Sequence, residues 1–163
     1  MKFIIDEMII GLVKWLRILG FDTVAIPFIK GEKIKDITSR YFITGSKKHF
    51  EEWQDQKKVF IPFTSVSKQL NYLNKELNIF EKIKFLSRCL LCNTKLFSVN
   101  KSEITDDIPS KVMEKFDRYY QCPNCNKIYW EGGHVQRKLD KLQRMGIKIN
   151  LNNNQGDNYG ESR

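Results

Sequence analysis

Four cysteines in two pairs constrain the fold of this chain more than any other feature of its sequence. They form the motifs Cys89-Leu-Leu-Cys92 and Cys122-Pro-Asn-Cys125, each with two intervening residues. This spacing lets one tight turn aim two sulfurs at one ion, and two such turns supply a complete tetrahedral shell for Zn²⁺. A closed shell leaves no position for water. The pattern therefore predicts a structural zinc that stabilises the fold and takes no part in catalysis.

Two other uses of the cysteines stay open from the sequence: two disulfide bonds, or redox pairs of the thioredoxin kind. Redox chemistry needs only one pair, and nothing marks the chain as secreted, because residues 1–6 reach an acid too early for a signal peptide. Zinc is therefore the favoured interpretation, and a reducing cytoplasmic compartment is the default. No apolar run is long enough to cross a bilayer, so we expect no membrane association.

The length of 163 residues suits one domain, or a small domain joined to a module that a metal stabilises. We expect an α/β domain over residues 1–84, a zinc ribbon with a basic C-terminal helix over 85–149, and a disordered tail over 150–163. The formal net charge of +9 indicates a polyanionic partner such as nucleic acid. A lysine-rich surface that only maintains solubility would give the same charge.

The first half of the chain alternates short apolar runs with stretches of helical periodicity. Four runs have the length of strands: 2–5, 23–27, 41–44 and 59–63. Helices are predicted over 8–19, 32–39, 45–54 and from 64 or 65 to about 80. This alternation predicts a parallel sheet flanked by helices. Ligands of such sheets bind beyond the carboxyl ends of the strands, where Asp6 could hold a divalent metal or simply cap the following helix.

The last predicted helix, over residues 134–149, has one basic and one apolar side. The basic side consists of His134, Arg137, Lys138, Lys141 and Arg144. A basic stripe can follow a phosphate backbone, and Tyr129 and Trp130 lie nearby as candidates for stacking on bases. The alternative is a solvated helix face above a packed aromatic core. His134 could also have a structural role at the start of the helix.

Several stretches together resemble a known family. They are Asp6-Glu7-Met8, Trp15-Leu16-Arg17-Ile-Leu-Gly20-Phe-Asp22, Ser87-Arg88-Cys89, Tyr120-Gln-Cys122-Pro123-Asn-Cys125, and Ile128-Tyr129-Trp130-Glu131-Gly132 with His134. The resemblance covers about residues 1–145 and is to the RNase domain at the carboxyl end of the Mut-seven exoribonuclease. It implies a PIN-like nuclease fold joined to a zinc ribbon, with metal-dependent cleavage of RNA.

The resemblance also implies roles for individual residues. Several acids at the strand ends would hold Mg²⁺ or Mn²⁺ for hydrolysis of a phosphodiester. The candidate acids are Asp6, Glu7, Asp22, Glu32 and Asp36. Lys14 and Arg17 would contact the scissile phosphate. The candidates for gripping RNA in the second half are Tyr129, Trp130, His134, Arg137, Lys138 and Lys141.

One departure from the family pattern falls after the third predicted strand. The family has Thr-Arg-Asp there, whereas this chain has Thr44-Gly45-Ser46, and a serine hydroxyl is a poor ligand for a hard divalent cation. Two functions therefore stay open: a metal-dependent ribonuclease, and a catalytically degenerate relative that binds RNA or a ribonucleoprotein. A zinc-stabilised adaptor for protein partners is a third. His49 is interpreted as an incidental surface residue.

Overall fold

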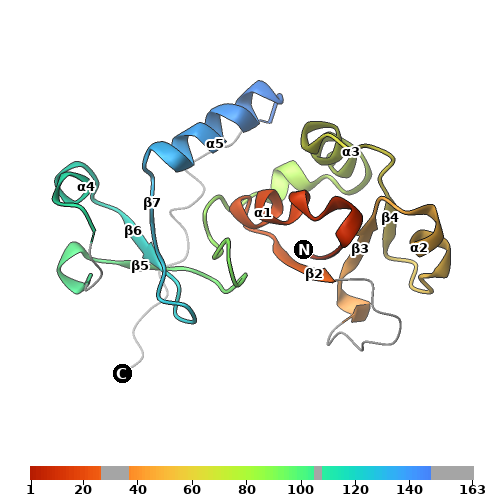
Figure 1. Ribbon diagram of the computed structural model, residues 1–163, viewed down its shortest axis with the longest axis horizontal. Helices are drawn as coiled ribbons and strands as arrows, with labels where there is room; N and C mark the ends of the chain where they lie inside the picture. Colours follow the sequence, from red (N-terminus) through yellow and green to blue (C-terminus); the bar gives the residue numbers. More distant parts are fainter. Residues whose placement is uncertain (27–36, 105–107, 148–163) are drawn as a thin grey trace.

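The computed structural model describes residues 1–26, 37–104 and 108–147. Its first part contains a four-stranded parallel sheet in the order β2-β1-β3-β4 (Figure 1). The strands are β1 (Lys2–Asp6), β2 (Asp22–Ile26), β3 (Tyr41–Thr44) and β4 (Lys58–Phe60). Ile4 of the central strand β1 is paired with Val24 on one side and Phe42 on the other, and all three lie on neighbouring parallel strands. The predicted parallel α/β architecture is confirmed.

Helical segments connect these strands or follow the last of them. They are η1 (Glu7–Ile9), α1 (Gly11–Ile18), η2 (Ile37–Ser39), α2 (Lys47–Glu52), α3 (Val66–Leu77) and η3 (Ile79–Lys82). Side chains cap several of them: Asp6 accepts from Met8 N, and Ser65 accepts from Lys68 N at the start of α3. Because Asp6 caps a 3-10 turn, the helix predicted from residue 8 becomes an α-helix only at Gly11.

Several predicted boundaries in this half differ from the structure, and two of them are examples. The fourth strand ends at Phe60 and not at Phe63, and the chain after Ile61 leads into the capping residue of α3. The helix predicted over 32–39 falls partly outside the described residues, and its described end is the 3-10 turn η2. Both differences concern the ends of elements, where hydrogen bonds of the loops decide the boundary.

The second part is a small antiparallel sheet with the order β5-β6-β7. Its elements are β5 (Phe97–Val99), η4 (Lys101–Glu103), α4 (Ser110–Lys115), β6 (Tyr119–Gln121), β7 (Ile128–Trp130) and the long helix α5 (Gly133–Arg144). Val99, Tyr119 and Ile128 form its own small buried core. The part of the chain with β5, β6, β7 and the two cysteine turns is called the ribbon below.

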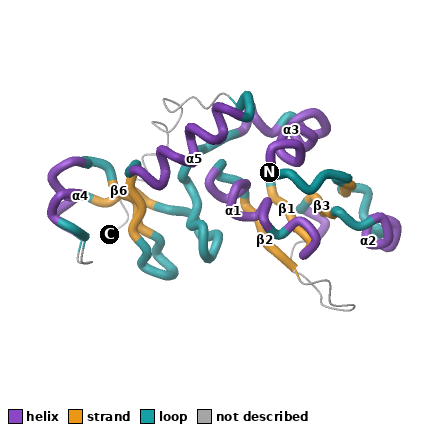
Figure 2. The backbone as a smooth tube through the Cα atoms, turned by 45° about the horizontal axis from the view of Figure 1, so that its top comes forward, coloured by secondary structure: helices purple, strands orange, loops and turns teal. Residues whose placement is uncertain are grey.

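Helix α5 connects the two parts of the molecule, as the two backbone views show (Figures 1 and 2). Its buried residues Val135, Leu139 and Leu142 belong to the same hydrophobic cluster as Leu12 and Leu16 of α1. The cluster therefore continues from the parallel sheet to the ribbon, and the predicted division between residues 84 and 85 stays a prediction. No helix within the described residues combines the length and apolar character that a membrane crossing requires.

Candidate functional site

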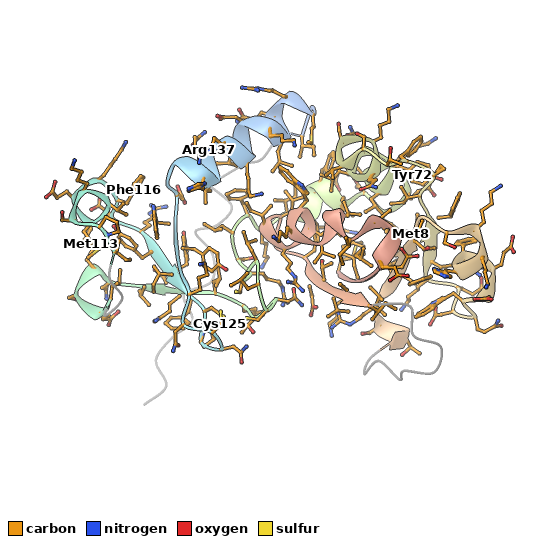
Figure 3. All side chains as sticks on the ribbon, viewed as in Figure 1. Met8, Tyr72, Met113, Phe116, Cys125 and Arg137 are labelled. Atoms are coloured by element: carbon orange, nitrogen blue, oxygen red, sulfur yellow. The ribbon has the colours of Figure 1, made fainter. Side chains whose placement is uncertain are left out.

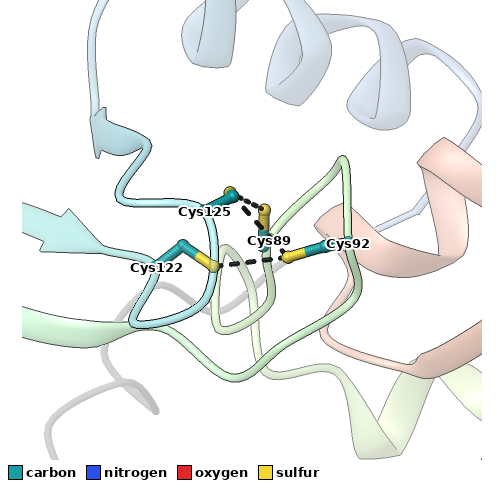
Figure 4. A group of neighbouring side chains, drawn as sticks. All are labelled: Cys89, Cys92, Cys122 and Cys125. Atoms are coloured by element: carbon teal, nitrogen blue, oxygen red, sulfur yellow. Dashed lines mark hydrogen bonds between the residues drawn. The ribbon is translucent and has the colours of Figure 1, made fainter.

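The four cysteines converge on one point although 33 or more residues separate Cys89 and Cys92 from Cys125. All four thiols are free, and their sulfurs lie within 4.8 Å of one another. The Sγ atoms of Cys92 and Cys122 are 3.4 Å apart, and those of Cys89 and Cys125 are 3.6 Å apart (Figure 4). Bonds of about 2.3 Å to a central Zn²⁺ would place tetrahedral sulfurs about 3.8 Å apart. The donor set therefore fits a metal such as zinc.

Both cysteine turns have the same backbone geometry. An asparagine follows the second cysteine of each pair, and its N–H donates to the carbonyl of the first: Asn93 to Cys89 at 3.0 Å, and Asn126 to Cys122 at 2.9 Å. Their φ angles are +67° and +59°, in the left-handed region that asparagine tolerates better than most residues. The repeated Cys-x-x-Cys-Asn sequence is thus the local reason that each turn closes.

Hydrogen bonds lower the pKa of Cys92 and, against the effect of burial, that of Cys89. The backbone of Lys127 acts in the same direction on Cys125, but burial and the three other thiols raise the pKa of Cys125 to about 12. The side chain and the backbone of Thr94 hydrogen-bond Cys92 and lower its pKa to about 5. The hydroxyl of Tyr129 lies 3.1 Å from the Sγ of Cys89 and also accepts from Leu90 N at 3.1 Å. Thiolate is the form that binds metal. The ring of Tyr129, a candidate for stacking on RNA, is therefore buried and oriented toward the cysteines.

Arg17 attaches the first cysteine turn to the parallel sheet. Its guanidinium donates to the carbonyls of Leu90 and Leu91 at 3.0 and 2.7 Å, and to the carbonyl of Thr23 at 3.0 Å. Burial lowers the pKa of Arg17, and the charges of the nearby cysteines oppose that shift. The structure thus places Arg17 at the cysteine turn. The guanidinium that was predicted to contact a scissile phosphate donates to backbone carbonyls instead.

Asp22 belongs to the same junction. Its carboxylate accepts from Arg40 at 2.7 Å and from the Asn93 side chain at 2.8 Å, and Arg88 lies 3.5 Å away. Burial acts to raise the pKa of Asp22, but these three partners together hold it below its ordinary value. Asn93 also accepts from Thr23 N at 3.0 Å. Asp22, a predicted catalytic acid, is therefore part of a hydrogen-bond and ion-pair network that joins the sheet to the ribbon.

Asp6 and Asp22 lie at opposite ends of the sheet. In the pairing of β1 with β2, Asp22 is opposite Lys2, whereas Asp6 is opposite Ile26. Four residues of strand correspond to about 13 Å. The structure therefore does not bring these two predicted acids together.

The side chain of Asp6 is completely buried, and three partners surround it. Its Oδ1 accepts from Met8 N at 2.8 Å, and its Oδ2 accepts from the hydroxyl of the buried Thr44. The Nδ1 atom of His49 lies 3.1 Å from the same Oδ2. The interpretation of His49 as incidental is wrong, because the first turn of α2 carries it back over the carboxyl end of β1.

At the carboxyl end of the sheet, none of the described residues expected there places a second carboxylate in contact with Asp6. Glu7 is exposed. Ser46, in the position of the expected family aspartate, uses its hydroxyl to accept from His49 N at 3.2 Å and so caps α2. Glu32 and Asp36 lie outside the described residues. Among the described residues, the four cysteines are the one group of three or more metal-ligating side chains.

Three lysines gather around Trp15 where α1 meets α5. The Nζ atoms of Lys138 and Lys141 lie 4.5 and 5.3 Å from the centre of the Trp15 ring. Burial lowers the pKa of Lys138, and repulsion from Lys14 and Lys141 lowers it further. These three residues with Trp15 are called the lysine cluster. It places Lys14 with α5 and not with Asp6.

Further basic residues of α5 continue from the lysine cluster toward the ribbon. His134 and Arg137 are exposed, and the Nη2 atom of Arg137 lies 2.7 Å from the Nδ1 atom of His134. Figure 3 labels Arg137 on α5 and Cys125 in the ribbon below it. The predicted basic side of the helix is therefore present, although Lys138 and Lys141 also pack on an aromatic ring.

A groove of about 790 Å³ lies between α5 and the ribbon. Its lining includes Leu90 and Leu91 of the first cysteine turn, Trp130 of β7, and Lys138 of α5. Gly132 lies directly under the Trp130 indole, where a Cβ would come within 2.3 Å of Nε1. The spacing Trp-x-Gly thus lets the ring fold onto the backbone at the edge of this groove.

The comparisons with known proteins gave one match. The family model described as the Mut7-C RNAse domain matches residues 1–142. Neither the curated proteins nor the solved structures gave a match.

Proposed function

The chain belongs to the Mut7-C RNAse domain family, and on this premise we propose that it binds RNA on the face shared by α1, α5 and the ribbon. The name of the family points to RNA as substrate or partner. The net charge of +9 agrees with a polyanionic partner. Zn²⁺ in the four-cysteine site would hold the ribbon in place and supply no catalytic chemistry.

The lysine cluster is the observation that carries this proposal. Lys14 comes from α1, whereas Lys138 and Lys141 come from α5, more than 120 residues later in the chain. Like charges brought together repel one another, and the pKa of Lys138 is lowered first by burial and further by this repulsion. A phosphate backbone relieves it and releases counterions when it binds. Arg137 extends the positive surface along the same helix, with the ring of His134 beside it.

The metal site has a direct part in forming this surface. Helix α5 begins three residues after β7 ends, and β7 follows the second cysteine turn. A metal that joins the two turns therefore fixes where α5 starts, while its buried residues fix how it lies on α1. A reducing intracellular compartment is part of the proposal, because four neighbouring thiols stay reduced there.

Cleavage of RNA is the second candidate function. Family membership and the position of Asp6 at the carboxyl end of a parallel strand favour it. Mg²⁺ or Mn²⁺ would have to bind a carboxylate that already has Met8 N, Thr44 and His49 as partners. Binding without cleavage is therefore the function that the described residues support best.

A binding measurement tests the first function. Fluorescence anisotropy of a labelled 12-nucleotide RNA should show affinity that falls steeply with salt, since several phosphates are neutralised. Lys141→Glu should weaken binding about tenfold. Lys115→Glu makes the same charge change on an exposed helical residue at the distant end of the ribbon, and should have a much smaller effect. Equal losses in both variants would contradict a defined binding face.

A cleavage assay tests the second candidate function, the cleavage of RNA. The metal-loaded protein is incubated with RNA in the presence and absence of Mn²⁺, beside Asp6→Asn. The proposal of binding without cleavage predicts intact RNA in every sample. Mn²⁺-dependent cleavage that Asp6→Asn abolishes would replace it with the ribonuclease function.

A further inference from the structure

We propose that the groove between α5 and the ribbon receives an unpaired base of RNA, so that the protein prefers single-stranded to duplex RNA. This inference rests on the proposed function and deepens it, because it names the form of RNA that is bound. It assigns a ligand to a groove that the sequence does not reveal, since its walls come from distant parts of the chain.

The groove is large enough to admit a nucleobase, and its lining suits one. About 790 Å³ lies in the usual range for sites that bind small molecules. The lining is mainly apolar and includes Leu90, Leu91, Ile108, Pro109 and the partly exposed Trp130. Leu91 is 59% exposed, which leaves its side chain available to a ligand. A base offers a flat apolar face to such walls.

The charges around the groove select an anionic ligand over an apolar peptide. Lys127 and Lys138 contribute positive charge to its lining and His134 a polar ring; Cys125 of the four-cysteine site also lines it, and no aspartate or glutamate does so within the described parts of the chain. Lys138 is shared, because it lines the groove and also lies over Trp15 in the lysine cluster. A phosphate on the lysine cluster thus brings the neighbouring nucleotide to the mouth of the groove.

This geometry favours an unpaired strand. In a duplex the bases are stacked and paired inside the helix, and turning one outward costs a few kcal/mol. Single strands present their bases freely to apolar and aromatic side chains. A surface with phosphate contacts alone would bind both forms, whereas the groove adds a contact that only the single strand can make.

The three tryptophans provide a direct measurement. Trp15 is in the lysine cluster and Trp130 lines the groove, whereas Trp53 is stacked on Phe42 in the parallel sheet, with a ring separation of 4.1 Å. The indole N–H signals of the ¹⁵N-labelled metal-loaded protein are followed by NMR during titration with a 12-nucleotide single strand and with the same sequence as a duplex. The single strand should shift Trp15 and Trp130, the duplex mainly Trp15, and neither should shift Trp53.

A pair of variants tests the groove by affinity. Leu91→Asp places a negative charge on the groove wall and should reduce affinity for the single strand about tenfold, with less effect on the duplex. Phe97→Asp is the matched control, because Phe97 is an exposed apolar residue of the ribbon, 42% exposed, that does not line the groove. Metal content of each variant confirms that the ribbon is folded.

The outcomes separate this inference from the proposed function. Equal affinity for both RNA forms, with an unshifted Trp130 signal, would overturn the groove proposal and leave RNA binding by the lysine cluster intact. Equal losses in Leu91→Asp and Phe97→Asp would overturn it as well. No binding of either RNA form would overturn both proposals.

Discussion

The two ends of the parallel sheet differ in a way that explains how the molecule is built. At the amino end, Asp22, Arg17 and Asn93 form a charged network that attaches the sheet to the first cysteine turn. At the carboxyl end, one buried carboxylate, Asp6, is closed by Thr44 and His49. Parallel sheets usually bind ligands at the carboxyl end. In this chain the positive surface and the four clustered cysteines belong instead with the amino end and the ribbon.

This difference teaches that ancestry and present chemistry need not coincide. The family relationship covers both ends. At the carboxyl end, however, Ser46 caps a helix where an aspartate was expected, and a histidine contacts the remaining acid. The cysteine site retains all four ligands.

The largest effect is expected from loss of a metal ligand. Structural zinc contributes an apparent binding free energy of about 10–16 kcal/mol near neutral pH, so Cys122→Ser should unfold the ribbon and release α5 from α1. Metal analysis and thermal unfolding followed by circular dichroism should show loss of metal and a lowered Tm. Lys115→Glu, in the same ribbon, should retain both. A Cys122→Ser variant with unchanged Tm would show that the metal does not stabilise the ribbon.

A smaller effect is expected at the junction. Arg17→Met removes a guanidinium that donates to three backbone carbonyls, and it should lower the free energy of unfolding by about 2–4 kcal/mol. Urea denaturation of the metal-loaded protein measures the change. Arg144→Met, at an exposed position of α5, should cost little. If both variants had the same stability, the charged network would not hold the ribbon to the sheet.

At the carboxyl end, Asp6→Asn should lower the free energy of unfolding by about 1–3 kcal/mol, because buried hydrogen bonds to a carboxylate are disturbed. Its affinity for RNA without divalent metal should equal that of the unchanged protein. Urea denaturation and anisotropy check the two quantities. A large loss of RNA affinity with unchanged stability would show that RNA is bound at the carboxyl end of the sheet.

The smallest effect concerns pH. The pKa of Asp22 is lowered in the folded protein, so its ionised form stabilises the fold above its ordinary pKa of about 3.9, and this contribution is lost as the pH falls through the folded value. Asp22→Asn should therefore be less stable than the unchanged protein by about 1 kcal/mol at neutral pH, with the difference shrinking below about pH 4. A difference independent of pH would contradict the ion pairs.

Most of the architecture could be predicted from local pattern. The alternation of apolar runs and helical stretches predicted the parallel sheet, and β3 has the predicted bounds. The two Cys-x-x-Cys turns predicted one cluster of four sulfurs. These features depend on residues close in sequence, or on a motif that carries its own geometry.

The contacts within the site could not be predicted to the same extent, because they join residues that are far apart in the sequence. Arg17 contacts Leu90 and Leu91 across more than 70 residues, and no periodicity indicates that. His49 gave a signal that was missed: it lies in the first turn of a helix that follows a parallel strand, and such turns lie beside the strand ends. The groove likewise depends on how α5 packs on α1.

The proposed binding face for RNA is formed by α1, α5 and the ribbon, and not by the carboxyl end of the sheet. Photocrosslinking of the metal-loaded protein to a single-stranded RNA that contains 4-thiouridine, followed by mass spectrometry of the crosslinked peptides, tests it most directly. Crosslinks are expected in peptides that contain Trp15, Leu91 or Trp130. Crosslinks confined to the peptides around Asp6 and His49 would contradict it.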